Sequence, residues 1–290
     1  SNLKKACISL SKVISKNSII IFESTVYPGV TENFCAPILS KYSSLKYNVD
    51  FFCGYSPERI NPGDKKHNIN NIVKLTSGST EKVSKIVDKL YSGVIKAGTY
   101  RTKSIKIAEA AKSIENAQRD INIAFINELK IIFDKMNLNI NEILDAANTK
   151  WNFLNFKPGL VGGHCIGVDP YYLSHVSQLN NYKPKVILSG RKVNDNFHKH
   201  LIKDFSKKFK NFKQKKKILI LGFTFKENCK DHRNSKIVKL RNGLIKKGFD
   251  VDIFDPYVDK KDVLNTYNLK ILSSIKKYCY DGVFIAVKHD

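Results

Sequence analysis

The sequence predicts an α/β fold in which two regions of parallel sheet flanked by helices are joined by one long helix. Three observations predict it. Short apolar runs alternate with helical patterns over the first hundred residues, and a second such region begins near residue 217. Between them, residues 104–136 contain neither glycine nor proline and carry apolar side chains at helical spacing.

The first hundred residues contain three apolar runs of strand length, separated by loops and helical patterns. This alternation favours a parallel sheet with helices packed against it. In chain order we expect an amphipathic start, a strand at 18–23, a loop at 27–29, a helix from Thr31, strands at 49–55 and 72–76, and a helix at 81–91.

The rest of the chain begins with the long helix at 104–136 and a shorter one at 140–147. A glycine-rich loop follows, and then a second βαβ region. The expected elements are a helix at 186–209, a lysine-rich segment at 213–217, a strand at 218–221, a helix near 235–247, and strands at 250–255 and 281–287, the last one buried.

Both ends of the chain indicate a piece of a longer protein. The chain begins at Ser1, and its only methionine is Met136. It also stops three residues after the strand at 281–287, where a domain of this class normally continues. We therefore expect further sequence on both sides.

The formal charge of +24 raises the question of nucleic-acid binding. However, only six of the 50 basic residues are arginines, and the lysines are spread along the whole chain. Phosphate and base recognition favours the planar arginine fork, whereas dispersed lysines coat solvated faces. We therefore favour a solvated basic surface, and keep a basic nucleic-acid-associated protein as the alternative from another class.

Six cysteines lie far apart, without a C-x-x-C pair, which favours reduced thiols in the cytoplasm over a disulfide framework or a zinc site. No apolar run approaches the ~18 residues of a membrane span, and the start lacks the apolar core of a signal peptide. The seven histidines show no ligand-like spacing on one helix face. We assign no metal.

The segment 158–173 (PGLVGGHCIGVDPYYL) contains a cysteine in unusual surroundings. Four glycines surround Cys165, at a cost in backbone entropy that tight turns or a closely approaching ligand would explain. A purely structural loop is the alternative, but a buried packing cysteine does not need this backbone. A reactive thiol does need access and nearby positive charge or N–H donors. Cys165 is therefore our candidate nucleophile, and Asp169 either a turn residue or one that orients a water or a lysine.

Three further groups of residues have charged or polar side chains that suit a ligand-binding or catalytic site. Lys112, Asn116 and Arg119 share one face of the long helix, where a solvated stripe is the alternative. Glu58 and Arg59 lie in the loop 56–63 (SPERINPG) after a predicted strand, the usual place of ligands in parallel sheets. A glycine and basic residues follow the strand at 218–221 and suit a phosphate, although the chain has no G-x-G-x-x-G.

Five segments in chain order carry a family resemblance. They are 23–29 (ESTVYPG), 56–63 (SPERINPG), 108–116 (AEAAKSIEN), 162–173 (GGHCIGVDPYYL) and 221–233 (LGFTFKENCKDHR). Together they resemble the UDP-glucose and UDP-N-acetyl-hexosamine 6-dehydrogenase superfamily over nearly the whole chain. The cysteine segment is most similar to the branch that acts on acetamido sugars, and within it to the dehydrogenase of Vi polysaccharide synthesis.

The resemblance implies two Rossmann-like parallel-sheet domains, the first incomplete, joined by a central helical domain. Residues 1–98 would be the C-terminal part of an NAD-binding domain. Residues 99–200 would be a helical dimerisation domain that contains the cysteine loop, and 201–290 a C-terminally truncated UDP-sugar-binding domain. The implied partners are NAD, a UDP-sugar and a second copy of the chain. No association with a membrane is implied. Because the family's G-x-G-x-x-G is absent, we expect the chain by itself to be inactive.

The resemblance also implies roles for individual residues. The catalytic residues would be Cys165 as nucleophile, Lys112 as acid/base, Asn116 and Asp169 as holders of substrate, water and Lys112, Glu58 as the base for hydrolysis, and Thr25. Thr25 and Arg233 would contact the cofactor. The substrate contacts would be Arg59, Ile60, Lys112, Asn116, Arg119, Gly162, Phe225 and Lys226. Arg191 would be a further contact, across a dimer interface.

The reaction implied is a two-step oxidation of the C6 alcohol of UDP-GlcNAc or UDP-GalNAc for surface polysaccharide synthesis. Cys165 would trap the aldehyde as a thiohemiacetal, which a second oxidation converts to a thioester that water cleaves. UDP-glucose is the alternative substrate. A binding or assembly module without turnover also stays open.

Overall fold

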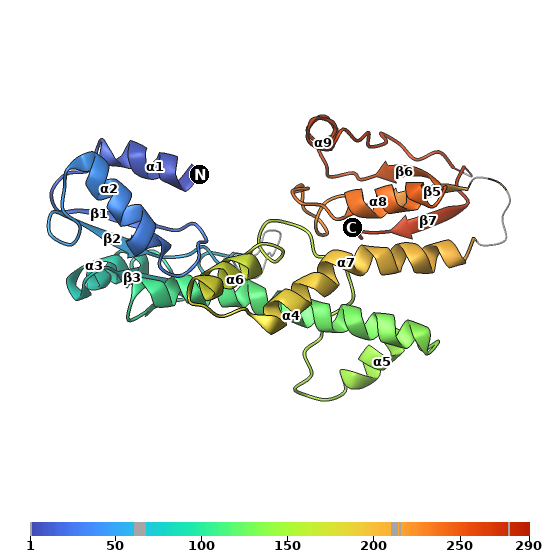
Figure 1. Cartoon of the computed structure of the whole chain (residues 1–290), viewed down its shortest axis with the longest axis horizontal. Coiled ribbons are helices and arrows are strands. Elements are labelled where there is room, and N and C mark those ends of the chain that lie inside the picture. Colours follow the sequence, from blue (N-terminus) through green and yellow to red (C-terminus); the bar gives the residue numbers. More distant parts are fainter. Residues whose placement is uncertain (1, 61–67, 210–213, 215, 278) are drawn as a thin grey trace. The chain divides into compact units, whose positions relative to one another are not determined.

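The computed structural model describes residues 2–60, 68–209, 214, 216–277 and 279–290. The chain divides into two compact units (Figure 1). The first comprises Ser1–Ala117 and Asp169–Pro184, and the second Gln118–Val168 and Lys185–Asp290. Residues 61–63 of the predicted SPERINPG loop, and residues 213 and 215 of the lysine-rich segment, lie outside the described residues. No described helix is both long and apolar enough to cross a membrane.

The sheet of the first unit has the strand order β1-β2-β3-β4. Its strands are β1 (Ser18–Phe22), β2 (Phe51–Tyr55), β3 (Lys74–Gly78) and β4 (Thr99–Arg101). β1 pairs in parallel with β2, and β3 with β4. The pair β2–β3 is antiparallel, so the prediction of a wholly parallel sheet was wrong here. A parallel pair needs a crossover, usually helical, and none of the described residues between β2 and β3 is helical.

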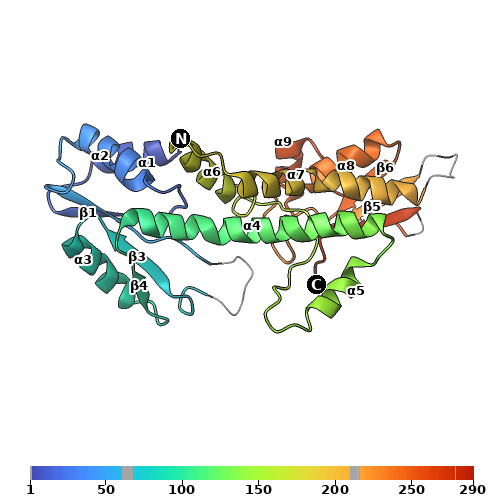
Figure 2. The same cartoon turned by 60° about the horizontal axis from the view of Figure 1, so that its bottom comes forward.

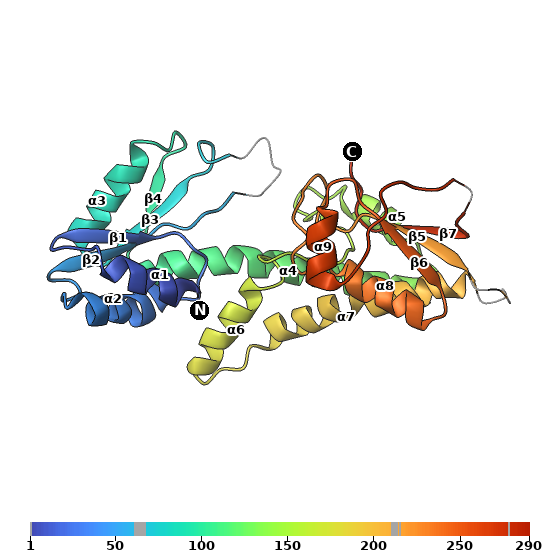
Figure 3. The same ribbon diagram turned by 90° about the horizontal axis from the view of Figure 1, so that it is seen from above.

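Helices cover both faces of this sheet. Figure 3 shows α1 (Asn2–Ser11) and α2 (Ala36–Ser43) on one face and α3 (Glu81–Ser92) on the other. The π-helical turn η1 (Thr31–Cys35) leads into α2. The core between the sheet and the first pair of helices is built around Cys7, Leu39, Phe51 and Tyr55, all fully buried. α6 (Asp169–Leu179), which the sequence analysis missed, also belongs to this unit.

The sheet of the second unit has the order β6-β5-β7 and is parallel throughout. Its strands are β5 (Lys217–Leu221), β6 (Asp250–Phe254) and β7 (Gly282–Ile285). The helices that lie wholly within this unit are α5 (Ile140–Ala147), α7 (Lys185–Lys207), α8 (Ile237–Lys246) and α9 (Lys260–Tyr267). Its core contains Ile218 and Ile220 of β5 and Leu240 and Leu244 of α8, each fully buried.

β7 was predicted to be a buried strand, and this was wrong for one of its faces. Val283 is 51% and Ile285 66% exposed, whereas Phe284 packs against the core. Successive side chains of a strand point to opposite faces. β7 lies at the edge of the described sheet, and its second face has no cover among the described residues.

The helix α4 (Ile105–Lys135) runs without interruption through 31 residues, as Figure 2 shows. Its residues up to Ala117 belong to the first unit and the others to the second. The structure confirms the predicted α/β class and the long helix, and each predicted element is found within two residues of its expected ends. Besides α6, the sequence analysis missed the short elements β4 and α9.

Candidate active site

The loop that follows β1 borders a cavity of about 480 Å³ in the first unit. Thr25 is one of its lining residues, together with Val26, Tyr27, Phe34 and Tyr172. The cavity thus lies beyond the carboxyl end of a parallel strand, where open α/β sheets bind their ligands. Its volume is in the range of small-molecule and cofactor sites.

A buried carboxylate on α4 holds this loop. Glu109 is fully buried and accepts hydrogen bonds from the backbone N–H groups of Gly29 and Thr31, at 2.5 and 2.9 Å. The Ser113 hydroxyl, one turn further along α4, donates to the carbonyl oxygen of Val26. Burial raises the pKa of Glu109, while the backbone donors oppose that shift. The sequence analysis missed Glu109, although it lies within the segment AEAAKSIEN that carries Lys112.

Two of the predicted site residues, Asn116 and Asp169, meet in the first unit. The amide nitrogen of Asn116 donates to a carboxylate oxygen of Asp169 at 2.5 Å. Asp169 begins α6 and is 2% exposed. Lys112, four residues before Asn116 and therefore on the same side of α4, is 8% exposed. A nearly buried ammonium beside this pair is suited to stabilise a negative charge on a substrate.

The loop after β2 is held by its own carboxylate and by α4. Glu58 accepts the backbone N–H groups of Arg59 and Ile60, both at 2.6 Å. The Arg59 guanidinium forms an ion pair with Glu115 at 2.6 Å and donates to the carbonyl oxygen of Val73. Glu115 gave no signal in the sequence. In this structure the predicted substrate contact Arg59 is thus oriented by two protein groups.

The cysteine loop belongs to the second unit, and its glycines lie close to Phe225. A Cβ atom at Gly162 would lie 3.2 Å from the Cβ atom of Phe225. At Gly163, where φ is +79°, it would lie 2.9 Å from the Phe225 ring. Both the close approach and the left-handed backbone therefore require glycine here. Cys165 follows this turn and is partly exposed, as a reactive thiol requires.

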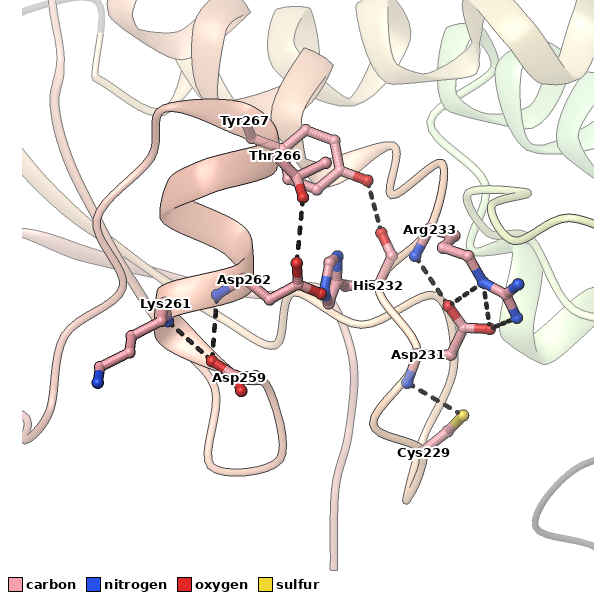
Figure 4. Close-up of polar contacts among 9 residues, drawn as sticks. All are labelled: Cys229, Asp231, His232, Arg233, Asp259, Lys261, Asp262, Thr266 and Tyr267. Carbon is pink, nitrogen blue, oxygen red and sulfur yellow. Dashed lines mark hydrogen bonds and ion pairs between the residues drawn. The ribbon is translucent and has the colours of Figure 1, made fainter.

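Charged side chains surround the start of this turn. Figure 4 shows Asp231 accepting from both the backbone and the guanidinium of Arg233, with the closest contact at 2.6 Å. The guanidinium also donates to His164 Nε2 at 3.4 Å, because an arginine can only donate, and His164 Nδ1 lies 3.5 Å from Asp231. The hydrogen bonds to Asp231 raise the pKa of Arg233, and Cys165 adds to this shift. The Arg233 guanidinium is thus held at the start of the cysteine loop by its ion pair with Asp231.

The loop after β5 carries Phe225 and Lys226 and is shaped by Asp255. This carboxylate follows β6, is fully buried and accepts the backbone N–H groups of Phe223 and Thr224 at 2.6 and 3.1 Å. It also accepts the N–H groups of Tyr257 and Val258. A small pocket beside the loop is lined by Gly162, Phe225 and Lys236, among others. Asp255 was missed, because nothing in its local sequence marks it.

Arg191 is placed differently from the expectation of a substrate contact. It is 2% exposed and lies in an ion-pair network with Asp120, at 2.6 Å, and Asp195, at 2.7 Å. Within one chain its guanidinium is thus held between two carboxylates, and a contact with substrate across a dimer interface stays a prediction. The predicted contact Arg119, by comparison, is exposed on α4.

Comparison with known proteins extends over the whole chain. Models of the UDP-glucose/GDP-mannose dehydrogenase family match three segments: the NAD binding domain at residues 1–95, the central domain at 106–196 and the UDP binding domain at 219–290. A UDP-N-acetyl-D-glucosamine 6-dehydrogenase of Salmonella typhi is 52% identical over 291 residues, which cover 99% of this chain and 68% of the relative. The chain belongs to the UDP-glucose/GDP-mannose dehydrogenase family.

Two further members of the family agree with this assignment. The protein CapL of Staphylococcus aureus is 50% identical, over 99% of this chain and 68% of its own length. The solved structure of a UDP-D-ManNAc dehydrogenase from Pyrococcus horikoshii matches with a TM-score of 0.85 and 30% identity, covering 100% of this chain and 67% of that one. The predictions of an oxidoreductase, of NAD as its cofactor and of a UDP-sugar as its substrate are confirmed at the level of the family.

Proposed function

We propose that this dehydrogenase oxidises the C6 alcohol of a UDP-N-acetyl-hexosamine, UDP-GlcNAc or UDP-GalNAc, to the uronic acid in two NAD-dependent steps. The observation that carries the proposal is the 52% identity to a UDP-N-acetyl-D-glucosamine 6-dehydrogenase across 99% of the chain. We further propose that the enzyme acts in the cytoplasm and that its product serves surface polysaccharide synthesis, since cysteines spread along the chain without a C-x-x-C pair fit a reducing environment.

The cofactor side of the site is assigned to Thr25 and Arg233. The cavity beside Thr25 has a volume suited to part of a dinucleotide and apolar walls such as Val26 and Phe34, which fit a planar ring. When bound, NAD accepts a hydride from C6 in each oxidation. Arg233 supplies a fixed positive charge that suits a phosphate or ribose oxygen, and Asp231 holds its orientation.

The sugar side of the site carries out the covalent chemistry. The first oxidation removes a hydride and a proton from the C6 alcohol. The Cys165 thiolate then adds to the aldehyde, and a proton completes the thiohemiacetal. Loss of a second hydride and a proton leaves a thioester, which water cleaves to the acid and the thiol. Lys112 stabilises the oxyanion in these steps.

The remaining roles are assigned from the family resemblance. Asn116 and Asp169, hydrogen-bonded to each other, orient Lys112 and the water, and Glu58 takes the proton of that water. The UDP-sugar contacts are assigned to Arg59, Ile60, Lys112, Asn116, Arg119, Gly162, Phe225 and Lys226. Residues 1–98, 99–200 and 201–290 are proposed as the NAD-binding, central and UDP-sugar-binding regions.

We also propose that the protein is a homodimer through α4. Four large apolar side chains on this helix are exposed by 44–55%: Ile107, Ile114, Phe125 and Ile132. Their spacings of seven, eleven and seven residues are close to whole numbers of helical turns, so they recur along one side of the helix. A second copy of α4 is a suitable cover for such a row.

The decisive experiment uses the full-length protein and measures NADH formed per sugar with UDP-GlcNAc, UDP-GalNAc and UDP-glucose, for the wild type and Cys165→Ser. The wild type should form two NADH per acetamido sugar and act more slowly on UDP-glucose. Cys165→Ser should lose the complete oxidation by at least about 100-fold, because the aldehyde is no longer trapped. Cys279→Ser, at an exposed cysteine, is the matched control and should behave as the wild type. A normal two-step rate in Cys165→Ser would exclude it as the nucleophile.

A further inference from the structure

Asn127, on α4, binds both backbone groups of Gly159. Its side-chain nitrogen donates to the Gly159 carbonyl oxygen at 3.0 Å, and its side-chain oxygen accepts the Gly159 N–H at 2.9 Å. Asn127 is fully buried. One amide thus replaces the pair of hydrogen bonds that a neighbouring strand would otherwise provide to Gly159.

Further contacts fix the orientation of this amide. The second hydrogen of the Asn127 nitrogen points to Asn194 on α7, whose side-chain oxygen accepts it at 2.9 Å. Asn194 in turn donates to the backbone and side-chain oxygens of Asp120, at 2.9 and 2.7 Å. Rotating the Asn127 amide by half a turn would set donor against donor and acceptor against acceptor. The buried network therefore permits one arrangement.

The residue that Asn127 holds lies six positions before Cys165, in a stretch with neither helix nor strand. The same loop has a second anchor four residues later, where Asn234 donates to the Gly163 carbonyl oxygen at 3.3 Å and Phe225 packs on Gly163. A glycine-rich segment has many backbone conformations available, and each anchor removes some of them. Cys165 follows the second anchor by two residues.

We propose that Asn127 is a positioning residue that holds the nucleophile loop, and through it the Cys165 thiol, in its productive place. This inference rests on the proposed role of Cys165. It assigns to α4 a function in catalysis that involves no contact with substrate or cofactor. A displacement of about 1 Å at a reacting group can lower a rate by about 100-fold. Loss of the two hydrogen bonds to Gly159, six residues before Cys165, is therefore able to affect turnover.

The test is Asn127→Asp, which keeps the shape of the side chain but faces the Gly159 carbonyl and Asn194 with an acceptor. In the full-length protein we measure kcat and KM for UDP-GlcNAc, and the rate of Cys165 alkylation by iodoacetamide, followed on its peptide by mass spectrometry. We expect kcat to fall by about tenfold or more, KM to stay within about twofold, and the alkylation rate to change by about threefold or more. Asn196→Asp makes the same change at a partly exposed position of α7 and should alter none of these values.

If Asn127→Asp does not fold, judged by circular dichroism, Asn127→Ser is measured in the same way, since its hydroxyl cannot reach both backbone groups and adds no charge. A folded variant with unchanged kcat and unchanged Cys165 alkylation would overturn the proposal. So would a fall in kcat with normal alkylation, because the loop would then be in place. Alkylation needs no turnover, so it reports on the loop even if Cys165→Ser shows that another residue is the nucleophile.

Discussion

At the scale of single residues, buried carboxylates and amides bind loop backbone at three places in this enzyme. Glu109 holds the loop of Thr25, Asn127 the loop of Cys165, and Asp255 the loop of Phe225. Each bridges residues at least 31 positions apart in the chain. Loops cannot satisfy their own backbone groups as helices and strands do, so a buried side chain that does so defines where the loop lies.

The contribution of the Asp255 carboxylate to stability depends on pH and can therefore be measured. Burial raises its pKa, but the backbone donors of Phe223, Thr224 and Tyr257, together with the His289 side chain, outweigh this effect and hold the pKa below its ordinary value. A lowered folded-state pKa stabilises the fold above the unfolded value of about 3.9, and this contribution is lost as pH falls through the folded pKa. Asp255→Asn should therefore lose about 2 kcal/mol at pH 7, with a smaller loss at pH 3.

Urea unfolding of wild type and variant at pH 7, 5 and 3 measures this difference. Asp250→Asn is the control, because Asp250 is half exposed and its ion pair with Lys217 spans 3.9 Å, so that its contribution should be small at every pH. A loss in Asp255→Asn that does not depend on pH would contradict the role of the charged carboxylate.

At the scale of elements, close packing of β3 on α3 depends on one glycine. A Cβ atom at Gly78 would lie 2.3 Å from the backbone nitrogen of Ser84 and 2.7 Å from its Cα atom. Backbone in a helix cannot move aside as a side-chain end can, so Gly78→Ala should destabilise the protein by about 3 kcal/mol. At Gly93, at the end of α3, φ is −69° and a Cβ would have no neighbour closer than 3.5 Å.

Gly93→Ala should accordingly be neutral, or stabilise by up to about 1 kcal/mol by restricting the unfolded chain. Thermal and urea unfolding of both variants, side by side, measure the contrast. Equal stability of the two variants would show that the space between β3 and α3 is not what selects glycine at residue 78.

At the scale of the whole molecule, the exposed apolar row on α4 predicts the state of assembly. Phe125→Glu would bring a charge into the proposed interface between two copies, and should weaken self-association by about tenfold or more. Ile86→Glu makes a comparable change on α3, where Ile86 is 45% exposed, and should leave association unchanged. Sedimentation equilibrium measures both. A monomeric wild type, or a Phe125→Glu variant that associates normally, would contradict the dimer.

The sequence by itself determined the α/β class, the course of the long helix and the segments that identify the family. Helices and strands can be recognised from the local sequence, because side chains that share a face recur every three to four residues in a helix and every two in a strand. The absence of glycine and proline from 104–136 and their concentration around Cys165 are equally local. These features were therefore accessible without coordinates.

Only the tertiary structure decided which loops are held, by what, and how the strands pair. The antiparallel pairing of β2 with β3 and the exposed face of β7 corrected expectations, and the ion pairs of Arg191 could not be predicted from the sequence. Glu109 and Asn127 look in the sequence like ordinary helix residues, since their partners lie 78 and 32 residues away. A hydrogen bond between distant segments leaves no periodic pattern, so its position follows from the packing of the folded chain.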